Sequence, residues 1–282
     1  MSFVIQGVPV KTMTHHCIVG DEELREQKSQ WTDVSVYVTN ACNASCKFCC
    51  NKNNKSFSFD FRKFKAFIDE LVGKIEVNKI TFTGGESSLN ITQLIKCVEY
   101  TKPFCNNITV ITNGTDLASL DHPFIDNISV SRHHYDDEKN KEIFGVSHMD
   151  ALETFSRKDR VNLSCNLIKG YVDCEEEIYK YLEYMSRVGI ESTAFVGLMP
   201  VNQYCKDNYV DLHKMKFNER VLKYKTIRFK EPGVCRCNNY VYLADNEAII
   251  EFYTRHNMCP NYQKGSLVVY KFNEVFNIYP EK

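Results

Sequence analysis

The chain has 282 residues, of which 43% are hydrophobic and 25% are charged. This length allows one large domain or two smaller ones, and this composition excludes disordered, collagen-like and coiled-coil proteins. Because 35 Lys and Arg balance 36 Asp and Glu, the net charge is −1, and we expect neither nucleic acid nor a membrane as a partner.

From residue 34 to residue 198, strand patterns alternate with helix patterns. Alternating apolar and polar residues, or short apolar runs ended by Gly, predict strands, whereas apolar residues spaced along one face predict helices. Strands are predicted over 34–39, 79–83, 108–112, 128–131, 161–167 and 191–198, and helices over 61–71, 91–100 and 176–188. This order is typical of βαβ units, so we expect an α/β fold, a partial (β/α)6 barrel of parallel strands, over residues 34–200.

The two ends of the chain lack this alternation. Residues 1–33 are predicted to be a polar, irregular N-terminal lead-in. Residues 201–282 are predicted to form a small C-terminal α+β extension. Its strands are expected near 226–229, 239–243, 267–272 and 275–279, and its helix near 247–254.

The sequence contains 13 cysteines, an odd number, in a chain longer than a typical disulfide-stabilised secreted domain. No apolar run approaches the roughly 18 residues that span a membrane, and the N-terminus lacks the features of a signal peptide. We therefore expect a cytoplasmic, reducing location, where thiols are either buried small apolar groups or metal ligands.

Three cysteines, Cys42, Cys46 and Cys49, follow the first predicted strand with the spacing Cys-x3-Cys-x2-Cys. Three neighbouring thiolates can hold a [4Fe–4S] cluster and leave one iron open to a small molecule. The alternative is a structural zinc site with Cys50 as the fourth ligand. The side chains of adjacent Cys49 and Cys50 point in different directions, which favours the iron–sulfur interpretation.

This cysteine loop, placed directly after the first strand of a β/α series, resembles that of the radical S-adenosylmethionine (SAM) superfamily. Family members commonly carry an aromatic residue before the third cysteine, and Phe48 occupies that position. The resemblance implies that Cys42, Cys46 and Cys49 bind a catalytic [4Fe–4S] cluster. It also implies that SAM binds the open iron and that Phe48 packs against the adenine of SAM.

A second element, Gly84-Gly85-Glu86, follows the second predicted strand. Taken alone, it could be a turn that leads into a helix. Glycines allow the backbone to approach a ligand closely, and a carboxylate can accept a hydrogen bond from an ammonium group. By the resemblance, this element holds the amino group of the methionine part of SAM.

Polar residues also end the third and fourth predicted strands. Thr112 and Asn113, followed by glycine, are either a turn or part of the cofactor side of the barrel. By the resemblance, a polar residue at the end of the fourth strand touches the ribose or carboxylate of SAM, and Ser131 and Arg132 are the candidates. An arginine there could pair with the carboxylate through two hydrogen bonds.

The remaining candidates come from the following loop and the last two strands. His133 and His134 are interpreted as part of a polar loop, with one histidine as a substrate contact or proton donor in the alternative. By the resemblance, Ser164 and Asn166 on the fifth strand approach the ribose of SAM. Leu198, at the end of the sixth strand, lies beside the adenine.

Four further cysteines, Cys205, Cys235, Cys237 and Cys259, lie in the C-terminal extension. They are either scattered buried thiols or ligands of an auxiliary iron–sulfur cluster, as in the short C-terminal twitch region of some radical SAM enzymes. The usual Cys-x2-Cys pairs of such regions are absent, and Cys17 could replace Cys205 as a ligand.

The resemblance implies an oxidoreductase that reductively cleaves SAM to a 5′-deoxyadenosyl radical, which abstracts hydrogen from a substrate. The short lead-in before the first strand favours a small-molecule substrate. A peptide-modifying maturase is the alternative within the family, and a non-catalytic zinc-binding protein is the alternative of another class. The electron is expected from a donor such as flavodoxin or ferredoxin.

Overall fold

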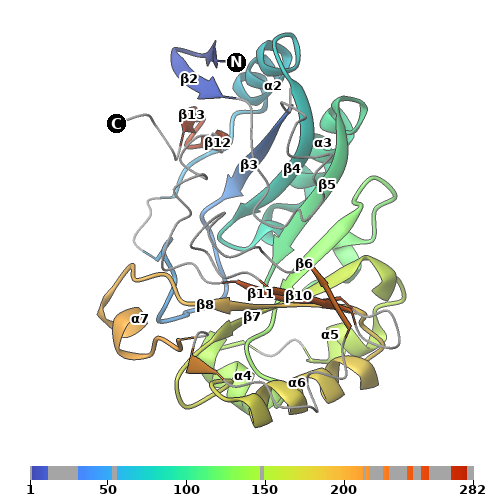
Figure 1. The fold of residues 1–282 in the computed structure, drawn as a ribbon. Coiled ribbons are helices and arrows are strands. Elements are labelled where there is room, and N and C mark those ends of the chain that lie inside the picture. The colour runs from blue at the N-terminus through green and yellow to red at the C-terminus, as the bar shows by residue number, and fades with distance from the viewer. Residues whose placement is uncertain are drawn as a thin grey trace.

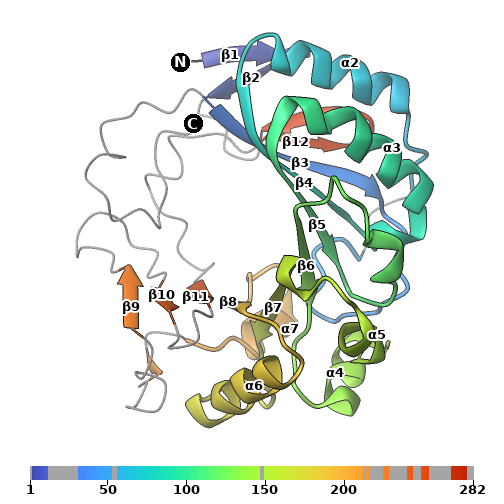
Figure 2. The ribbon, with the colours of Figure 1, turned by 90° about the vertical axis from the view of Figure 1, so that its right-hand side faces the viewer.

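The computed structural model describes residues 2–11, 31–52, 56–146, 149–211, 214–215, 225–228, 240–243, 249–253 and 268–277. Within them, an 11-stranded sheet forms the centre of the molecule, in the order β13-β12-β3-β4-β5-β6-β7-β8-β11-β10-β9 (Figure 1). Figure 2 shows the sheet curved into an open arc, with the larger helices on its outer side.

The elements in this part of the chain have the following bounds. The strands are β1 (Ser2–Ile5), β2 (Val8–Lys11), β3 (Trp31–Thr39), β4 (Glu76–Gly84), β5 (Cys105–Thr112), β6 (Asn127–Ser131), β7 (Val161–Leu167), β8 (Ser192–Gly197), β9 (Lys225–Arg228), β10 (Tyr240–Leu243), β11 (Ile249–Tyr253), β12 (Val268–Lys271) and β13 (Glu274–Asn277). The helices are α2 (Phe61–Val72), α3 (Ile91–Thr101), α4 (Asp137–Phe144), α5 (Met149–Thr154), α6 (Glu175–Arg187) and α7 (Gln203–Asp207).

Six strands, from β3 to β8, lie side by side in chain order, and each is parallel to the next. Helices occupy several of the crossovers between them, as parallel pairing requires. The prediction of an α/β fold with a partial barrel is therefore confirmed. Because all six strands run in the same direction, their carboxyl ends and the loops that follow them meet at one edge of the sheet.

The amphipathic pattern of α2 explains how the outer layer packs. Four residues on one face are buried against the sheet: Phe64, Phe67, Ile68 and Leu71. The helix begins after Asp60, whose side chain accepts a hydrogen bond from the Arg62 backbone N–H at 2.9 Å. This face joins the inward residues of β3, β4 and β5 in one apolar core.

The prediction of an irregular lead-in is wrong for its first residues. β1 and β2 pair as an antiparallel hairpin around Gln6 and Gly7, and Ile5 and Val10 are fully buried in the core. Two short apolar segments, one on each side of Gln6-Gly7, are a hairpin signal. Residues 12–30, which include Cys17, lie outside the described part of the chain.

The C-terminal extension is less separate than the sequence suggests. The expected strands correspond to β9, β10, β12 and β13, but the helix expected near 247–254 is wrong, since β11 occupies Ile249–Tyr253. β11 pairs in parallel with β8, and β12 pairs in parallel with β3. Strands from the extension therefore add to both sides of the six-stranded barrel sheet.

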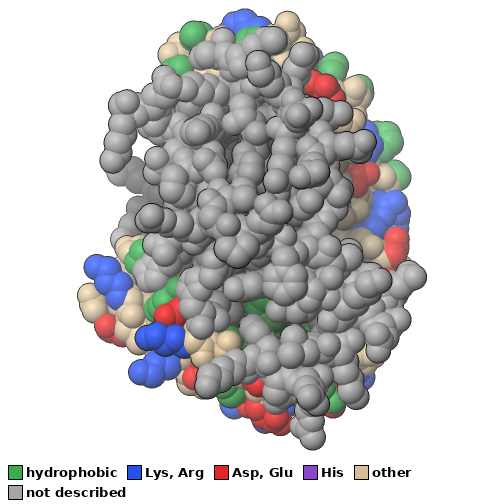
Figure 3. Space-filling model, in the orientation of Figure 1, with side chains coloured by type: hydrophobic (Ala, Val, Ile, Leu, Met, Phe, Trp, Pro, Cys, Tyr) green, Lys and Arg blue, Asp and Glu red, His purple; other side chains and the backbone are tan. Residues whose placement is uncertain are grey.

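Charged side chains of both signs occur together on the described part of the surface. Figure 3 shows basic and acidic side chains side by side near α7, in keeping with the net charge of −1. Among the described residues, no helix combines the length and the apolar character needed to cross a bilayer.

Candidate functional site

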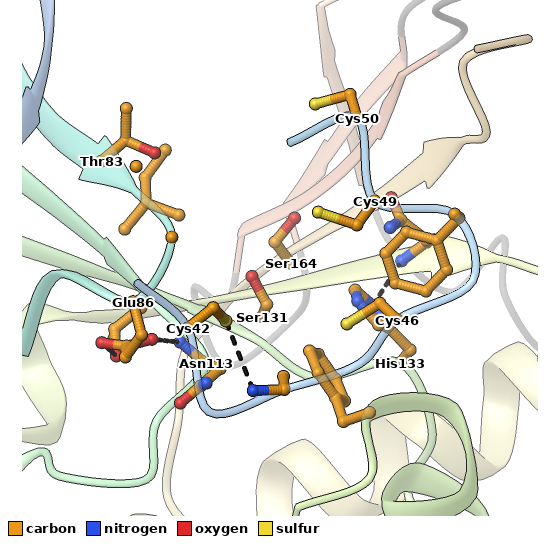
Figure 4. A pocket seen from close by; sticks show the side chains of 18 of the residues that line it. Cys42, Cys46, Cys49, Cys50, Thr83, Glu86, Asn113, Ser131, His133 and Ser164 are labelled. Carbon is orange, nitrogen blue, oxygen red and sulfur yellow. Dashed lines mark hydrogen bonds between the residues drawn. The ribbon is translucent and has the colours of Figure 1, made fainter. Parts of the chain in front are cut away.

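A cavity of about 320 Å³ lies at the carboxyl ends of the parallel strands. Cys42, Cys46 and Cys49 line it, on the loop that follows β3. Figure 4 shows the thiols of Cys46 and Cys49 turned toward the same space as the hydroxyls of Ser131 and Ser164. The strand ends that the sequence singled out thus open onto one shared cavity.

The backbone of the cysteine loop is held by hydrogen bonds with residues of two helix ends. The Ser45 N–H donates to the carbonyl oxygen of Phe144, the last residue of α4, at 2.8 Å. Asn202, the N-cap of α7, donates from Nδ2 to the Lys47 carbonyl oxygen at 3.0 Å. These anchors fix the loop over the strand ends without using its thiols.

Gly84 and Gly85 lie directly against the start of the cysteine loop. A Cβ on Gly84 would stand 2.0 Å from the Thr39 carbonyl oxygen, and one on Gly85 would stand 2.0 Å from that of Ala41. Gly84 also has a φ of +142°, which side-chain-bearing residues rarely adopt. Only glycine fits at either position, so the close backbone approach is part of the site.

Glu86 is fully buried, and its carboxylate is bound by the protein itself. Oε1 accepts hydrogen bonds from the backbone N–H and hydroxyl of Ser88, at 3.0 and 2.8 Å, and from the Thr112 hydroxyl at 2.7 Å. Oε2 accepts one from the Asn113 N–H at 2.6 Å. The carboxylate therefore joins the end of β4 to the end of β5. Thr112 lines the cavity, but its hydroxyl is used in this link.

Ten of the eleven predicted cofactor-binding residues line the cavity: Phe48, Gly84, Gly85, Glu86, Thr112, Asn113, Ser131, Ser164, Asn166 and Leu198. Ser131 and Ser164 are direct neighbours across β6 and β7, which places two hydroxyls next to each other. Asn113 also donates from Nδ2 to Asn43 Oδ1 at 2.6 Å, which ties the end of β5 to the cysteine loop.

Arg132 is the exception, and its predicted contact with SAM is not supported. Its side chain is fully buried away from the cavity, with its guanidinium 4.6 Å from the Tyr184 ring centroid. It also donates to the Tyr135 carbonyl oxygen at 3.2 Å and lies 3.5 Å from Asp137 Oδ1. Successive residues of an extended chain point to opposite faces, so Ser131 and Arg132 cannot both face the cavity.

His133 lines the cavity. From the sequence, a site role for one of the two histidines was only the alternative to a polar loop. Its ring stacks on Phe144 with centroids 4.5 Å apart and meets Phe48 edge-on at 4.9 Å. Nδ1 accepts a hydrogen bond from the Asn166 backbone N–H at 3.0 Å, so in the neutral ring the proton is on Nε2. His133 and Phe48 together give the cavity an aromatic wall.

Further cavity residues were missed altogether. Ser129 lies two residues before Ser131 on β6, so the same strand face predicts it. Other missed residues are Ala44, Thr83, Ile111, Phe144 and Val201. Thr83 and Ile111 directly precede the predicted Gly84 and Thr112, whereas Phe144 reaches the cavity from α4.

The thiols of the loop affect one another. Burial, and then the negative charges of Cys49 and Cys42, raise the pKa of Cys46 to about 12. Burial also raises the pKa of Cys42 above its ordinary value, and the charges of Glu86 and Cys49 add to this effect. Thiols bind metals as thiolates, so loading a metal group here must release protons.

The donor set fits an iron–sulfur cluster. Cys42, Cys46 and Cys49 line one cavity from a single loop, and cysteine thiolates are the usual ligands of such clusters. Among the described residues, no three His, Cys, Asp or Glu side chains are grouped closely enough to hold one metal ion.

Cys205 is the one predicted auxiliary-cluster ligand that the structure describes. It is 1% exposed and packs in an apolar cluster with Phe144, Ile168 and Leu198. Cys235, Cys237 and Cys259 lie outside the described residues. The auxiliary cluster stays a prediction, and the surroundings of Cys205 are those of a packing residue.

The fold and the cavity define a β/α-barrel enzyme with a cysteine-rich loop over its strand ends. A family model described as "Radical SAM superfamily" matches residues 36–203, more than half of the chain. The chain belongs to the radical SAM superfamily. The cofactors of this superfamily, a [4Fe–4S] cluster and SAM, are therefore those of this enzyme.

Individual relatives match parts of the chain. "Probable GTP 3′,8-cyclase" of Thermococcus kodakarensis is 26% identical over 170 residues, which cover 56% of this chain and 54% of that protein. YydG of Bacillus subtilis, whose name refers to peptide biosynthesis, is 39% identical over 85 residues, which cover 29% of this chain and 26% of YydG. The chain thus spans about half, or less, of the length of these relatives.

Solved structures support the fold. Streptococcus suis SuiB, bound to SAM, aligns with a TM-score of 0.57 and 15% identity. The alignment covers 86% of this chain and 54% of SuiB. The alignment therefore extends beyond the residues of the six barrel strands.

Proposed function

We propose that Cys42, Cys46 and Cys49 hold the [4Fe–4S] cluster and that SAM binds beside it in the 320 Å³ cavity. The observation that carries this proposal is the meeting of the three thiols with the glycine pair and the polar ends of β6 and β7 in one cavity. When bound, the reduced cluster supplies the electron that splits SAM into methionine and a 5′-deoxyadenosyl radical, which abstracts hydrogen from the substrate.

The chain's own residues bind and orient the cofactor. Gly84 and Gly85 let the backbone approach it, and Glu86 holds the ends of β4 and β5 in place for that approach. Ser131, Ser164 and Asn166 offer polar groups for the ribose and carboxylate of SAM.

The aromatic wall serves the adenine and helps to keep water from the reacting atoms. His133 is 2% exposed, stacked on Phe144 and in a T-shaped contact with Phe48. A ring held between rings has little freedom to move, so His133 gives the half-buried ring of Phe48 a fixed neighbour, and Phe48 offers the surface for stacking.

The substrate that we propose is a small molecule. The GTP 3′,8-cyclases support this choice, because their matches cover a larger share of the chain than the match to YydG does, 64% for the cyclase of Lactiplantibacillus plantarum against 29%. The second candidate is a peptide. It is supported by the higher identity to YydG and by the SuiB fold, which was also solved with a precursor peptide.

The test is anaerobic reconstitution with iron and sulfide, followed by reduction in the presence of SAM. We expect 5′-deoxyadenosine to form with the unsubstituted chain and not with the triple variant of Cys42, Cys46 and Cys49 to Ala. Cys97→Ala, which removes a buried thiol of α3, is the matched control and should retain the activity. Absence of iron in the reconstituted unsubstituted chain would contradict the proposal.

A deuterium experiment separates the two substrate classes. GTP deuterated on its ribose is the first probe, and transfer of deuterium to 5′-deoxyadenosine would support a small-molecule substrate. Lack of transfer from GTP, together with transfer from a deuterated precursor peptide, would favour the second candidate. Flavodoxin and ferredoxin replace the chemical reductant in a parallel assay, because we propose a donor of this kind.

A further inference from the structure

Lys271, the last residue of β12, lies against the cysteine loop although more than 200 residues separate them in sequence. Its Nζ donates a hydrogen bond to Asn51 Oδ1 at 3.2 Å, across 220 residues. The ammonium group also lies 4.4 Å from the Tyr37 ring centroid and 5.0 Å from that of Phe272. Aromatic faces attract a cation, so two rings and one amide hold this charge in place.

The strand and the turn after it fix the position of Lys271. β12 pairs with β3 in parallel, and the neighbouring Tyr270 is buried with its ring stacked on Phe67 at 5.0 Å. After Lys271 the chain turns through Asn273, whose Oδ1 accepts from the Asp60 N–H and whose Nδ2 donates to the Ser58 carbonyl oxygen, both at 2.8 Å.

Asn51 connects this lysine to both halves of the cofactor site. Its backbone N–H donates to the sulfur of Cys49 at 3.3 Å, and its Nδ2 donates to the Gly84 carbonyl oxygen at 3.1 Å. Its remaining amide atom, Oδ1, accepts from Lys271. One asparagine therefore links a proposed cluster ligand, the glycine pair and the lysine of a distant strand.

The charges of the thiols and the lysine interact. Burial lowers the pKa of Lys271 from its ordinary value, and negative charge on Cys50 and Cys49 opposes this change. The geometric link between Lys271 and Cys49 is Asn51, which contacts both residues. Nearby charge and hydrogen bonds to the sulfur atoms are among the factors that set the reduction potential of an iron–sulfur cluster.

We propose that Lys271 is a positioning residue that raises the reduction potential of the cluster held by the cysteine loop, through its own charge and through Asn51. Adding an electron makes the cluster more negative, and a fixed positive charge stabilises that state. This inference rests on the proposed function, because it requires Cys49 to be a cluster ligand.

The test is a redox titration of the reconstituted protein, followed by electron paramagnetic resonance. The signal to follow is the one that changes when SAM is added, since only a cluster with an open iron responds in this way. In Lys271→Met and Lys271→Gln we expect the one-electron reduction equilibrium to become less favourable by about tenfold, a shift of 59 mV to more negative potential. Lys271→Arg should retain the original midpoint.

Lys65→Met is the matched control. Lys65 Nζ also lies over an aromatic ring, 4.7 Å from the Tyr100 centroid, but on α2 in the outer layer. Its removal takes away the same charge and the same kind of contact, and the midpoint should not change.

Two results would overturn the inference, and they distinguish its failure from the failure of the proposed function. An unchanged midpoint in both Lys271→Met and Lys271→Gln, at the iron content of the unsubstituted chain, would leave the proposed function intact and remove the role of Lys271. Absence of any SAM-sensitive signal in the unsubstituted chain would overturn the proposed function and this inference with it.

Discussion

The thiol of Cys205 lies 3.8 Å from the backbone carbonyl oxygen of Phe48, so α7 contacts the cysteine loop through a buried sulfur atom. The same helix residue donates its N–H to Asn202 Oδ1 at 2.9 Å. This arrangement makes Cys205 part of the packing beneath the aromatic wall and argues against a role for it in an auxiliary cluster.

Replacing Cys205 by Ala should therefore leave the iron content unchanged and lower the free energy of unfolding by about 1 kcal/mol. Iron analysis and urea denaturation measure the two effects. Cys174→Ala, at an exposed position before α6, is the control and should change neither quantity. Loss of one cluster's iron from Cys205→Ala would instead identify Cys205 as a ligand.

Gly84→Ala should disrupt the site by steric collision with the Thr39 carbonyl oxygen. We expect a loss of about 3 kcal/mol in the free energy of unfolding, together with loss of SAM binding. Gly170→Ala is the matched control, because Gly170 also has a positive φ, +84°, but a Cβ there meets nothing within 4 Å. Gly170→Ala should lower the free energy of unfolding by about 1 kcal/mol, because only the backbone conformation becomes unfavourable. Equal losses in both variants would disprove the steric argument.

Glu86→Gln should destabilise the protein as well as weaken the binding of SAM. The NH2 group of the new glutamine would face the backbone N–H of Ser88 or Asn113, and two donors cannot form a hydrogen bond. We expect the free energy of unfolding to fall by about 2–3 kcal/mol. Denaturation and calorimetric titration with SAM give both quantities, and Glu99→Gln, on the exposed side of α3, is the control. Unchanged stability with lost SAM affinity would mean that Glu86 acts on the ligand directly rather than by positioning the strand ends.

The lowered pKa of His134 makes the free energy of unfolding depend on pH. Burial lowers its pKa to about 4, from an ordinary value of 6.5. Between these values the unfolded chain binds more protons than the folded one, so stability rises with pH. It should fall by up to about 3 kcal/mol as the pH drops from about 6.5 to about 4.

His134→Asn tests this dependence by urea denaturation at several pH values. The asparagine oxygen can still accept from the Asp136 N–H, as Nδ1 of His134 does at 2.9 Å. The variant should lose much of the slope between these pH values. A slope equal to that of the unsubstituted chain would show that other groups cause the dependence.

The barrel and most of the cavity could be predicted because their signals are local. Amphipathic helices separate several of the strands from β3 to β8, the cysteine motif directly follows β3, and the glycine motif begins at the last residue of β4. Strand β11 could not be identified in this way, because the apolar residues of Ile249–Tyr253 fit either a helix or a strand. Pairing with β8, a distant part of the chain, decides between them.

The face on which a residue lies was harder to predict than its element. Ser131 and Arg132 were both candidates, although an extended chain sends them to opposite sides. The role of Lys271 had no signal in sequence, because it depends on β12 lying beside β3. A lysine at a strand end usually stays in solvent, and only the turn at Asn273 and the ring of Tyr37 bring it to the loop.

The 220 residues between Asn51 and Lys271 also set an order of events during synthesis. At about 5–20 residues per second, the ribosome needs roughly 10–40 s to proceed from one residue to the other. During that time β3 lacks the strand that later pairs with its edge, and open edges are sites of incorrect association. The cysteine loop is thus made well before the strand that completes its surroundings.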